Sequence, residues 1–165
     1  MLNKDLPLVS VIMNCYNGEK YVRQAIDSVY GQTYKNWEII FWDNASTDDS
    51  LIIAKLYNDG KLKYYSASEN TTLGVARNAA IGKANGKLIA FLDVDDYWEE
   101  SKLELQVPLF KRENVGAVCG NYWIESELDN KRDCKILSKN NLSRGFVMDR
   151  LLSNYFVGNL TLVIR

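Results

Sequence analysis

The sequence predicts an α/β domain in which a mostly parallel sheet is covered by helices on both faces. Two observations predict it. Short apolar runs with the length of buried strands alternate with segments whose apolar residues recur at helical spacing, and three of the runs end in polar, turn-forming clusters. With 165 residues, 47% of them hydrophobic and 25% charged, the chain suits a single domain, residues 1–165, with a substantial core.

The expected elements alternate along the chain. Strands are expected at 8–13, 37–42, 61–66, 87–92 and 115–123, and helices around 22–29, 49–58, 73–84 and 102–113. Asn17 is the expected N-cap of the first helix and Gly31 its end, and Pro108 is expected to weaken or kink the last helix.

The signal becomes weaker after residue 124. We expect a loop over 125–141, a short helix over 143–153, and a strand over 159–165 with no element after it. An exposed apolar strand at the edge of a sheet invites aggregation, so the chain looks truncated at its C-terminus.

Composition excludes several classes of protein. The net charge is −1 without a clustered basic run, so a nucleic-acid partner is not expected. Cys15, Cys119 and Cys134 are odd in number and form no CxxC pair, which argues against a disulfide framework or a thiolate zinc site and favours a reducing compartment. Histidine is absent, which excludes Ser-His-Asp triads, Cys-His proteases and HExxH metalloproteases. There is no signal peptide or apolar window of about 18 residues, so we expect a cytoplasmic protein without a transmembrane segment.

Polar clusters follow three of the expected strands, at residues 14–17, 43–48 and 93–96. Ligands of parallel sheets bind in the crevice outside the carboxyl ends of the strands. We therefore expect these three clusters, which are far apart in the sequence, to line one crevice.

The third cluster contains Asp93, Asp95 and Asp96, directly after the apolar run 89–92. Alternate residues of an extended segment lie about 6–7 Å apart on the same side, so Asp93 and Asp95 can face the crevice together. Two carboxylates about 4 Å apart repel by about 4 kcal/mol at an effective dielectric near 20, which favours a bound cation unless one of them takes up a proton. Oxygen ligands select Mg²⁺ or Mn²⁺, which also bind substrate phosphates, so the expected ligand is a nucleoside diphosphate.

The bland alternative for this cluster is a solvated turn in which Asp96 caps the next helix. Each of three tryptophans could likewise belong either to the core or to the site. Trp37 and Trp42 bound a buried strand and are expected in the core, whereas Trp98 suits the site and the core equally well.

Four segments together resemble glycosyltransferase family 2: LVSVIMNCYN (8–17), QTYKNWEIIFWDNASTDDS (32–50), LGVARNAAIGKANGKLIAFLDVDDYW (73–98) and KLELQ (102–106). The resemblance implies a Rossmann-like GT-A fold and the N-terminal portion of a catalytic domain. It also implies metal-dependent transfer of a hexosyl-type sugar from a nucleotide-diphosphate donor, expected to be a UDP-sugar, with inversion. The implied acceptor is a glycan or lipid-linked glycan of the cell envelope, reached from the cytoplasm with peripheral association at the inner face of the membrane.

The resemblance also implies residue roles, which start with the nucleotide base. Asn14, Tyr16 and Asn17 would pack against the base, and the pair Asp43 and Asn44 would read it. Many members have Asp at the position of Asn44, and the family commonly has Pro or Thr at the position of Asn14, so the base pocket is expected to differ in shape. The bland alternatives are a core aromatic for Tyr16 and a helix cap for Asn17.

Further roles concern the phosphates and the metal. Arg77 and Asn78 would orient the base-reading pair and the ribose-phosphate, although Arg77 could instead pair with Glu69 or Asp59 on the surface. Asp93 would face the ribose or sugar, and Val94 would belong to the nucleotide-binding residues. Asp95 would hold the Mn²⁺ or Mg²⁺, and Asp93 and Asp96 complete the implied metal set.

In the family the general base lies in an acidic motif after a strand like 159–165, so the resemblance places it beyond Arg165. We therefore expect this chain to bind donor with metal and to transfer sugar poorly by itself. Three alternatives stay open: a DxD-type phosphatase with Asp93 as nucleophile, a phosphoacceptor receiver domain, and a non-catalytic module that binds a nucleotide-sugar.

Overall fold

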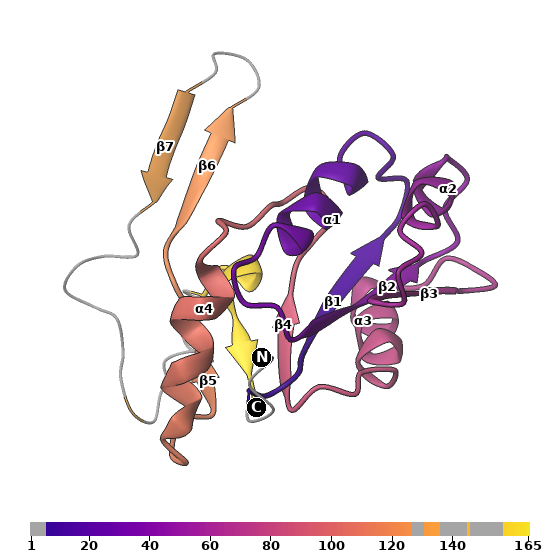
Figure 1. Cartoon of the computed structure of the whole chain (residues 1–165). Coiled ribbons are helices and arrows are strands. Elements are labelled where there is room, and N and C mark those ends of the chain that lie inside the picture. The colour runs from indigo at the N-terminus through magenta and orange to yellow at the C-terminus, as the bar shows by residue number, and fades with distance from the viewer. Residues whose placement is uncertain (1–5, 127–130, 136–144, 146–156) are drawn as a thin grey trace.

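The computed structural model describes residues 6–126, 131–135, 145 and 157–165. Within them, six strands form one sheet in the order β3-β2-β1-β4-β8-β5 (Figure 1). The strands are β1 (Val9–Cys15), β2 (Trp37–Asp43), β3 (Leu62–Ser66), β4 (Leu88–Phe91), β5 (Ala117–Val118) and β8 (Val163–Ile164). The first four are parallel, and β8 runs antiparallel to both β4 and β5. The predicted mostly parallel sheet is confirmed.

Helices cover both faces of the sheet, as predicted. They are α1 (Val22–Tyr30), α2 (Ser50–Ala54), α3 (Leu73–Ile81) and α4 (Lys102–Gln106), with the 3₁₀ turns η1 (Val107–Lys111) and η2 (Asn159–Thr161). Because alternate residues of a strand face opposite sides, β1 supplies two separate cores. Val11 and Met13 pack in the cluster that contains α1, whereas Ile12 packs with Ala80 of α3 on the other face.

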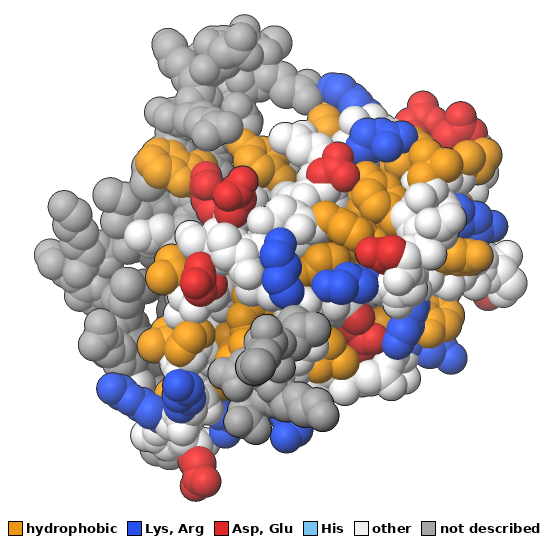
Figure 2. All heavy atoms as spheres, viewed as in Figure 1, with side chains coloured by type: hydrophobic (Ala, Val, Ile, Leu, Met, Phe, Trp, Pro, Cys, Tyr) orange, Lys and Arg blue, Asp and Glu red, His pale blue; other side chains and the backbone are white. Residues whose placement is uncertain are grey.

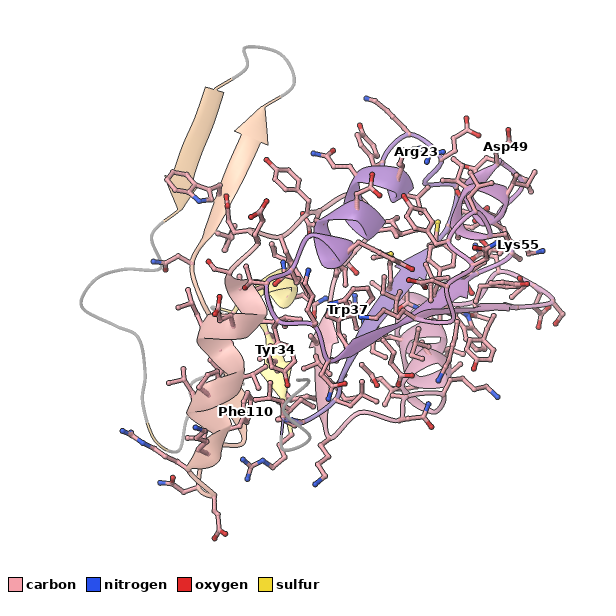
Figure 3. All side chains as sticks on the ribbon, in the orientation of Figure 1. Arg23, Tyr34, Trp37, Asp49, Lys55 and Phe110 are labelled. Atoms are coloured by element: carbon pink, nitrogen blue, oxygen red, sulfur yellow. The ribbon has the colours of Figure 1, made fainter. Side chains whose placement is uncertain are left out.

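The larger core holds the aromatic residues that follow α1 and begin β2. Trp37 is 4% exposed, and its ring meets Tyr30 edge-on at 4.9 Å between centroids. Tyr34 and Trp37, both labelled in Figure 3, belong to the same cluster as Phe110. The prediction that Trp37 is a core residue is confirmed. Trp42 is half-buried and stacks on Tyr65 of β3.

Helix ends differ from the prediction where side chains found other partners. Asn17 is not the N-cap of α1: the cap is Tyr21, and the Oδ1 of Asn17 accepts a hydrogen bond from the backbone N–H of Thr47. Gly31 ends α1 as predicted. Asp96 caps no helix, because α4 is preceded by Ser101.

The helix expected over 102–113 is interrupted near Pro108, as predicted. It ends as α4 at Gln106 and continues as the 3₁₀ turn η1, because proline supplies no backbone N–H. The helix expected over 49–58 is shorter and ends at Ala54.

The C-terminal predictions fare less well. The run 115–123 is divided between β5 and a separate two-stranded antiparallel sheet made of β6 (Tyr122–Ser126) and β7 (Lys131–Lys135), so the loop expected over 125–141 is wrong at β7. The segment 159–165 is not an exposed edge, because β8 is hydrogen-bonded on both sides. The helix expected over 143–153 lies outside the described residues except for Gly145.

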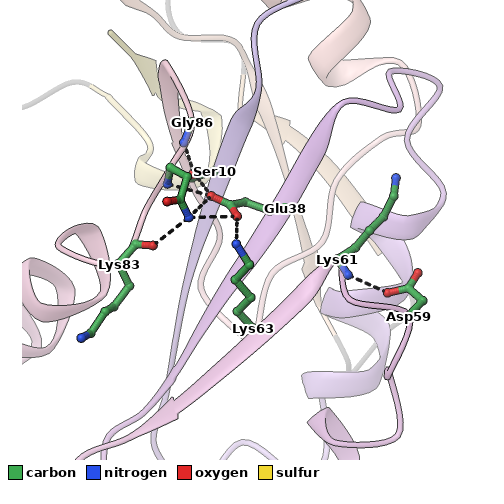
Figure 4. A network of polar contacts seen from close by, with 8 residues as sticks. Ser10, Glu38, Asp59, Lys61, Lys63, Lys83 and Gly86 are labelled. Carbon is green, nitrogen blue, oxygen red and sulfur yellow. Dashed lines mark hydrogen bonds and ion pairs between the residues drawn. The ribbon is translucent and has the colours of Figure 1, made fainter. Parts of the chain in front are cut away.

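A buried carboxylate ties three strands together at the amino end of the sheet (Figure 4). Glu38 of β2 accepts hydrogen bonds from Ser10 Oγ at 2.6 Å and from the backbone N–H of Asn85 at 2.8 Å, and it pairs with Lys63 at 2.7 Å. The backbone N–H of Gly86 donates to Ser10 Oγ at 2.8 Å. This network fixes β1, β2 and the turn before β4, and therefore the place where their opposite ends meet.

None of the helices within the described residues is both long and apolar enough to cross a membrane.

Candidate functional site

The loops after β1 and β2 are joined by hydrogen bonds. Cys15 is the register partner of Asp43, and the N–H of Asn44 donates to the Cys15 carbonyl at 2.8 Å. Two residues further along the first loop, the N–H of Asn17 donates to Ser46 Oγ at 2.9 Å, and Asn17 has a φ of 53°. Two of the three predicted polar clusters therefore form one surface.

The third cluster joins them through a close contact. A Cβ atom at Gly18 would lie 2.8 Å from Cγ2 of Val94, a distance that carbon atoms do not tolerate. Only glycine at position 18 lets the acidic loop after β4 approach the loop after β1 so closely. Val94 itself is 9% exposed. The three clusters thus lie at the carboxyl ends of β1, β2 and β4, as predicted, and Val94 packs between loops. They do not line one crevice as expected, because the clusters after β1 and β2 border one pocket and the acidic cluster borders another.

Arg77 and Asp93 form an ion pair within the site. Arg77 Nη2 lies 2.8 Å from Asp93 Oδ1, and the two side chains are 24% and 36% exposed. The guanidinium carbon also lies 5.7 Å from the ring centroid of Phe91. Arg77 therefore pairs with Asp93, and not with the surface acids Glu69 or Asp59. Asn78, the next residue of α3, is exposed.

Asn159 is a site neighbour that sequence reasoning missed. Its Nδ2 donates to Asp93 Oδ2 at 3.4 Å, so both oxygens of Asp93 face a donor. The residue belongs to η2, which precedes β8. Its position in the sequence gave no signal, because the insertion of β8 beside β4 was not predicted.

Asp95 and Asp96 complete the acidic loop. Asp95 is exposed, and the N–H of Asp96 donates to the Asp93 carbonyl at 3.0 Å in a tight turn. Burial, together with the charges of Asp95 and Asp93, raises the pKa of Asp96 to about 6. The neighbouring charges thus disfavour the ionised form of Asp96, which is the condition that a bound cation relieves.

The donor set suits a hard divalent cation that is shared with a substrate. Among the described residues, no three acidic, cysteine or histidine side chains converge into a ready-made metal site. Mg²⁺ and similar ions commonly take one or two protein carboxylates and fill the other positions with phosphate oxygens and water. Asp95 and Asp96 fit that pattern. Asp93 fits it less well, because Arg77 and Asn159 bind its oxygens.

A small pocket of about 210 Å³ lies between the end of β1 and the start of α3. It is lined by Asn14, Cys15, Tyr16, Asn44, Asn70, Thr71, Leu73 and Ala76. The ring of Tyr16 is 54% exposed, so Tyr16 is not the core aromatic of the bland alternative. Asn70, Thr71 and Leu73 were missed, although they follow the carboxyl end of β3 and the rule for parallel sheets applies to them too.

Two buried asparagines line this pocket, and they differ in the hydrogen bonds of their side-chain amides. The Nδ2 of Asn44 donates to the Thr71 carbonyl at 2.8 Å, and its Oδ1 accepts from Thr71 Oγ1 at 2.9 Å. Asn14 is 8% exposed, and neither Nδ2 nor Oδ1 of its amide has a hydrogen-bond partner among the described residues. Buried amides are rarely left without partners, so Asn14 is the side chain most in need of a polar ligand.

Asp43 is the last residue of β2 and does not line the pocket. It is 3% exposed, and its carboxylate accepts a weak bond from the N–H of Ser46 at 3.3 Å. The structure thus gathers all the predicted base-side residues at one end of the sheet, with Asn17 turned toward Thr47.

A second, larger pocket of about 650 Å³ begins at Asp95 and Asp96 and extends along α4, β5 and β6. Trp98 lines it but is only 4% exposed, and its indole N–H donates to the Leu160 carbonyl at 2.8 Å. Trp98 is therefore both a core residue and a wall of this pocket. Sequence reasoning did not predict the pocket, because it depends on the position of β6.

Comparison with known proteins agrees with these features. The family described as glycosyl transferase family 2 matches residues 10–164. The chain is 35% identical over 157 residues to the Escherichia coli UDP-Glc:alpha-D-GlcNAc-diphosphoundecaprenol beta-1,3-glucosyltransferase WfgD, covering 95% of this chain and 60% of that protein. It is 33% identical to the putative teichuronic acid biosynthesis glycosyltransferase TuaG of Bacillus subtilis, covering 96% of this chain and 62% of the relative. The chain thus spans about three fifths of the length of these relatives.

Solved structures agree as well. The crystal structure of S. aureus TarS in complex with UDP superposes with a TM-score of 0.63 at 30% identity, over 66% of this chain and 33% of that one. The mannosyltransferase PcManGT from Pyrobaculum calidifontis, in complex with GDP-Man and Mn²⁺, gives a TM-score of 0.66 at 26% identity, over 76% of this chain and 38% of that one. The sheet is that of the GT-A glycosyltransferases, and the chain belongs to glycosyltransferase family 2.

Proposed function

We propose that this chain binds a UDP-sugar with a divalent cation, and that it serves the transfer of the sugar to a lipid-linked glycan with inversion at the anomeric carbon. The observation that carries the proposal is the meeting of three polar loops at the carboxyl ends of β1, β2 and β4, with a small pocket against the start of α3 and the acidic loop tied to α3 by the Arg77–Asp93 pair. The relative WfgD is named for a UDP-Glc donor and a diphosphoundecaprenol-linked acceptor, and TarS was solved with UDP.

The base is proposed to bind in the 210 Å³ pocket. Tyr16 offers an exposed ring for stacking, and Asn14 offers an amide donor and acceptor that lack other partners among the described residues. Asn44 is held by Thr71, so it shapes the pocket while its amide stays bonded to that loop. Asn17 and Asp43 support the same end of the sheet through Thr47 and Ser46.

The ribose and phosphates are proposed to lie toward the acidic loop. Arg77 holds Asp93 by a 2.8 Å ion pair, which fixes the carboxylate for contact with ribose or sugar hydroxyls. Asn78 and Val94 are proposed to belong to the same nucleotide-binding set. Asp95 and Asp96 are the proposed metal ligands. Asp93 is a less suitable metal ligand than these two, because its oxygens accept hydrogen bonds from Arg77 and Asn159.

The chemistry requires an in-line displacement. The acceptor hydroxyl oxygen forms a bond to the anomeric carbon, the bond from that carbon to the diphosphate oxygen breaks, and the hydroxyl proton passes to a general base. The electron pair leaves with the nucleoside diphosphate. A bound Mn²⁺ or Mg²⁺ supplies Lewis-acid stabilisation of the leaving diphosphate. We assign the general base to none of the described residues.

The alternatives are less well supported. Family membership argues against the phosphatase and receiver-domain interpretations. A nucleophilic Asp93 would also have to leave its contacts with Arg77 and Asn159. A non-catalytic nucleotide-sugar-binding module shares the binding site and differs only in lacking transfer. The proposal places the protein in the cytoplasm, at the inner face of the membrane where a lipid-linked acceptor would be reached.

A thermal-shift panel tests the proposed donor. The chain is heated with UDP, GDP, dTDP or CMP, each with and without Mn²⁺. UDP with Mn²⁺ at about one hundred times its dissociation constant should stabilise the chain by about 2.7 kcal/mol, which is about 5–11 °C in Tm for a chain of this size.

Two variants and one assay complete that test. Asp95→Asn should remove the metal-dependent part of the UDP shift, whereas Glu113→Gln, an exposed acid on the loop after η1, should leave it unchanged. Transfer from UDP-glucose to a prenyl-diphosphate-linked GlcNAc then separates an enzyme from a binding module. A UDP shift that does not depend on Mn²⁺ would refute the assignment of the acidic loop.

A further inference from the structure

The larger pocket has apolar walls that are not part of the proposed donor site. Its lining includes Leu105 and Leu109 on one side and Trp123 and Ile124 on the other, and these side chains are 68%, 50%, 55% and 43% exposed. Figure 2 shows hydrophobic side chains exposed over α4 and η1. A pocket of about 650 Å³ with apolar walls and a few polar groups has the size and composition of a small-molecule site.

One cation lies inside this apolar lining. Lys102 is the first residue of α4, its Nζ donates to Gln106 Oε1 at 2.8 Å, and it lies 4.0 Å from the ring centroid of Trp98. Within the described part of the chain, no carboxylate forms a salt bridge with Lys102. Burial lowers the pKa of Lys102 to about 7. A half-buried cation without a salt-bridge partner among the described residues is costly, and an anion bound beside it in the pocket would relieve that cost.

Gln106 fixes Lys102 in place. Its Oε1 accepts from Lys102, while its Nε2 donates to the Thr161 carbonyl at 2.9 Å. The side chain of Gln106 is 8% exposed, so this bridge is sheltered from water. The ammonium group is therefore held at a defined position on the pocket wall.

The three chemical parts of the pocket follow one another in space. Asp95 and Asp96, at one end, belong to the proposed donor site. Lys102 begins α4, and at about 1.5 Å per residue Leu105 lies about 5 Å further along the helix. Leu109 follows in the 3₁₀ turn η1, where the rise is about 2 Å per residue, and lies about 12 Å from Lys102 along the chain direction. The order is thus acidic loop, cation, apolar wall.

We propose that this pocket binds the acceptor as a prenyl diphosphate, with the hydrocarbon chain against Leu105, Leu109 and Trp123 and the diphosphate at Lys102. The inference rests on the proposed function and names the acceptor class of that same site. A sugar attached to the diphosphate then points toward Asp95 and Asp96, where the donor is proposed to lie. An entirely apolar occupant would leave the charge of Lys102 without a counter-anion, so it fits less well.

Calorimetric titration of the 165-residue chain tests the inference. Farnesyl diphosphate, farnesol and inorganic pyrophosphate are titrated separately in EDTA, so that no divalent cation draws a diphosphate to the acidic loop. Farnesyl diphosphate should bind at least tenfold more tightly than either of its two parts. Equal binding of pyrophosphate and farnesyl diphosphate would overturn the proposal, because the apolar wall would then contribute nothing.

Variants separate the cation from the apolar wall. Lys102→Met should weaken farnesyl diphosphate at least tenfold and leave farnesol unchanged, and Lys102→Arg should retain most of the affinity. Lys111→Met removes the same charge at the end of η1, outside the pocket lining, and should change neither. If Lys102→Met does not fold, Leu105→Asn, at an exposed position, is the deciding variant. It should weaken the binding of both farnesyl diphosphate and farnesol. Unchanged affinities for both would overturn the proposal.

Binding of UDP with Mn²⁺ is measured on the same proteins. It should be equal in wild type, Lys102→Met and Leu105→Asn. Loss of prenyl diphosphate binding with intact UDP binding is the result expected of the variants. Wild-type protein that binds UDP with Mn²⁺ but no farnesyl diphosphate would refute this inference alone, whereas failure to bind UDP would refute the proposed function.

Discussion

Glu38→Gln tests whether the buried network at the amino end of the sheet holds β1, β2 and the turn before β4 in register. Glutamine keeps the shape of the side chain but removes its charge. The bonds from Ser10 and Asn85, at 2.6 and 2.8 Å, change from charge-assisted to neutral, a loss of about 1 kcal/mol each. The pair with Lys63, whose side chain is 41% exposed, contributes at most about 1 kcal/mol.

The variant should therefore unfold with a free energy about 2–3 kcal/mol lower than wild type, which corresponds to a decrease in Tm of about 4–12 °C. Urea unfolding, followed by tryptophan fluorescence at pH 7, measures the difference. Lys63→Met is the matched control. It removes only the exposed ion pair, and it should cost about 1 kcal/mol or less.

The same difference should depend on pH with a definite sign. Burial alone would raise the pKa of Glu38, but the bonds from Lys63, Ser10 and Asn85 outweigh it and hold the pKa below its ordinary value of 4.5. A carboxyl whose pKa is lower in the folded state stabilises above the unfolded pKa, and the contribution is lost as pH falls through the folded value. The gap between wild type and Glu38→Gln should thus narrow from pH 7 to below pH 4. Equal stability at pH 7, or a gap independent of pH, would refute the reasoning.

Three further predictions concern single contacts. Gly86→Ala should destabilise by at least about 2 kcal/mol in urea unfolding, because the new Cβ would lie 2.6 Å from the backbone nitrogen of Ser10. Arg77→Met should cost about 1 kcal/mol of stability, because the ion pair with Asp93 is partly exposed, and it should weaken UDP binding with Mn²⁺ about tenfold in calorimetry. Trp98→Phe should lower the free energy of unfolding by about 1–2 kcal/mol, because it leaves the carbonyl that accepts the indole N–H without its donor.

Matched substitutions control for these three. Gly74→Ala, in α3 with no atom within 4 Å of the new Cβ, should be neutral or stabilising. Lys83→Met removes a cation after α3 and should leave UDP binding unchanged. Trp123→Phe, at a side chain 55% exposed, should change stability by less than about 0.5 kcal/mol. If a control variant loses as much as its partner, the contact named for that partner is not the cause.

The amino-terminal half of the fold could be predicted because local pattern and tertiary environment agree there. Every residue of Val9–Cys15 is buried, as expected for a parallel strand covered on both faces, and the apolar face of α1 is the one that sequence spacing gives. The rule that ligand loops follow the carboxyl ends of parallel strands then located the three polar clusters without any knowledge of the structure.

Predictions failed where a residue's partner lies far away in the sequence. Asn17 has the composition of an N-cap, but its Oδ1 bonds to Thr47, thirty residues on. The run 159–165 has the composition of an exposed strand, but β8 is inserted between β4 and β5 and brings Asn159 to Asp93. Local pattern cannot specify either outcome, because each depends on which loop or strand the rest of the chain places alongside.

In the site, too, some features could be predicted from the sequence and others could not. The position of Asp95 and Asp96 in a loop at the carboxyl end of a buried strand could be predicted, because the apolar run 89–92 ends directly before them. The unsatisfied amide of Asn14, the hold of Thr71 on Asn44 and the position of Lys102 beside Trp98 could not, because they depend on side-chain packing.

The central claim is that the acidic loop after β4 binds a divalent cation together with a nucleoside diphosphate. A crystal of the chain grown with UDP and Mn²⁺, with anomalous data collected at the manganese edge, tests it most directly. We expect an anomalous peak within coordination distance of the Asp95 carboxylate and of the UDP phosphates, with the uracil ring beside Tyr16 and Asn14. Manganese bound elsewhere, or UDP bound with the carboxylates of Asp95 and Asp96 turned to bulk water, would contradict the claim.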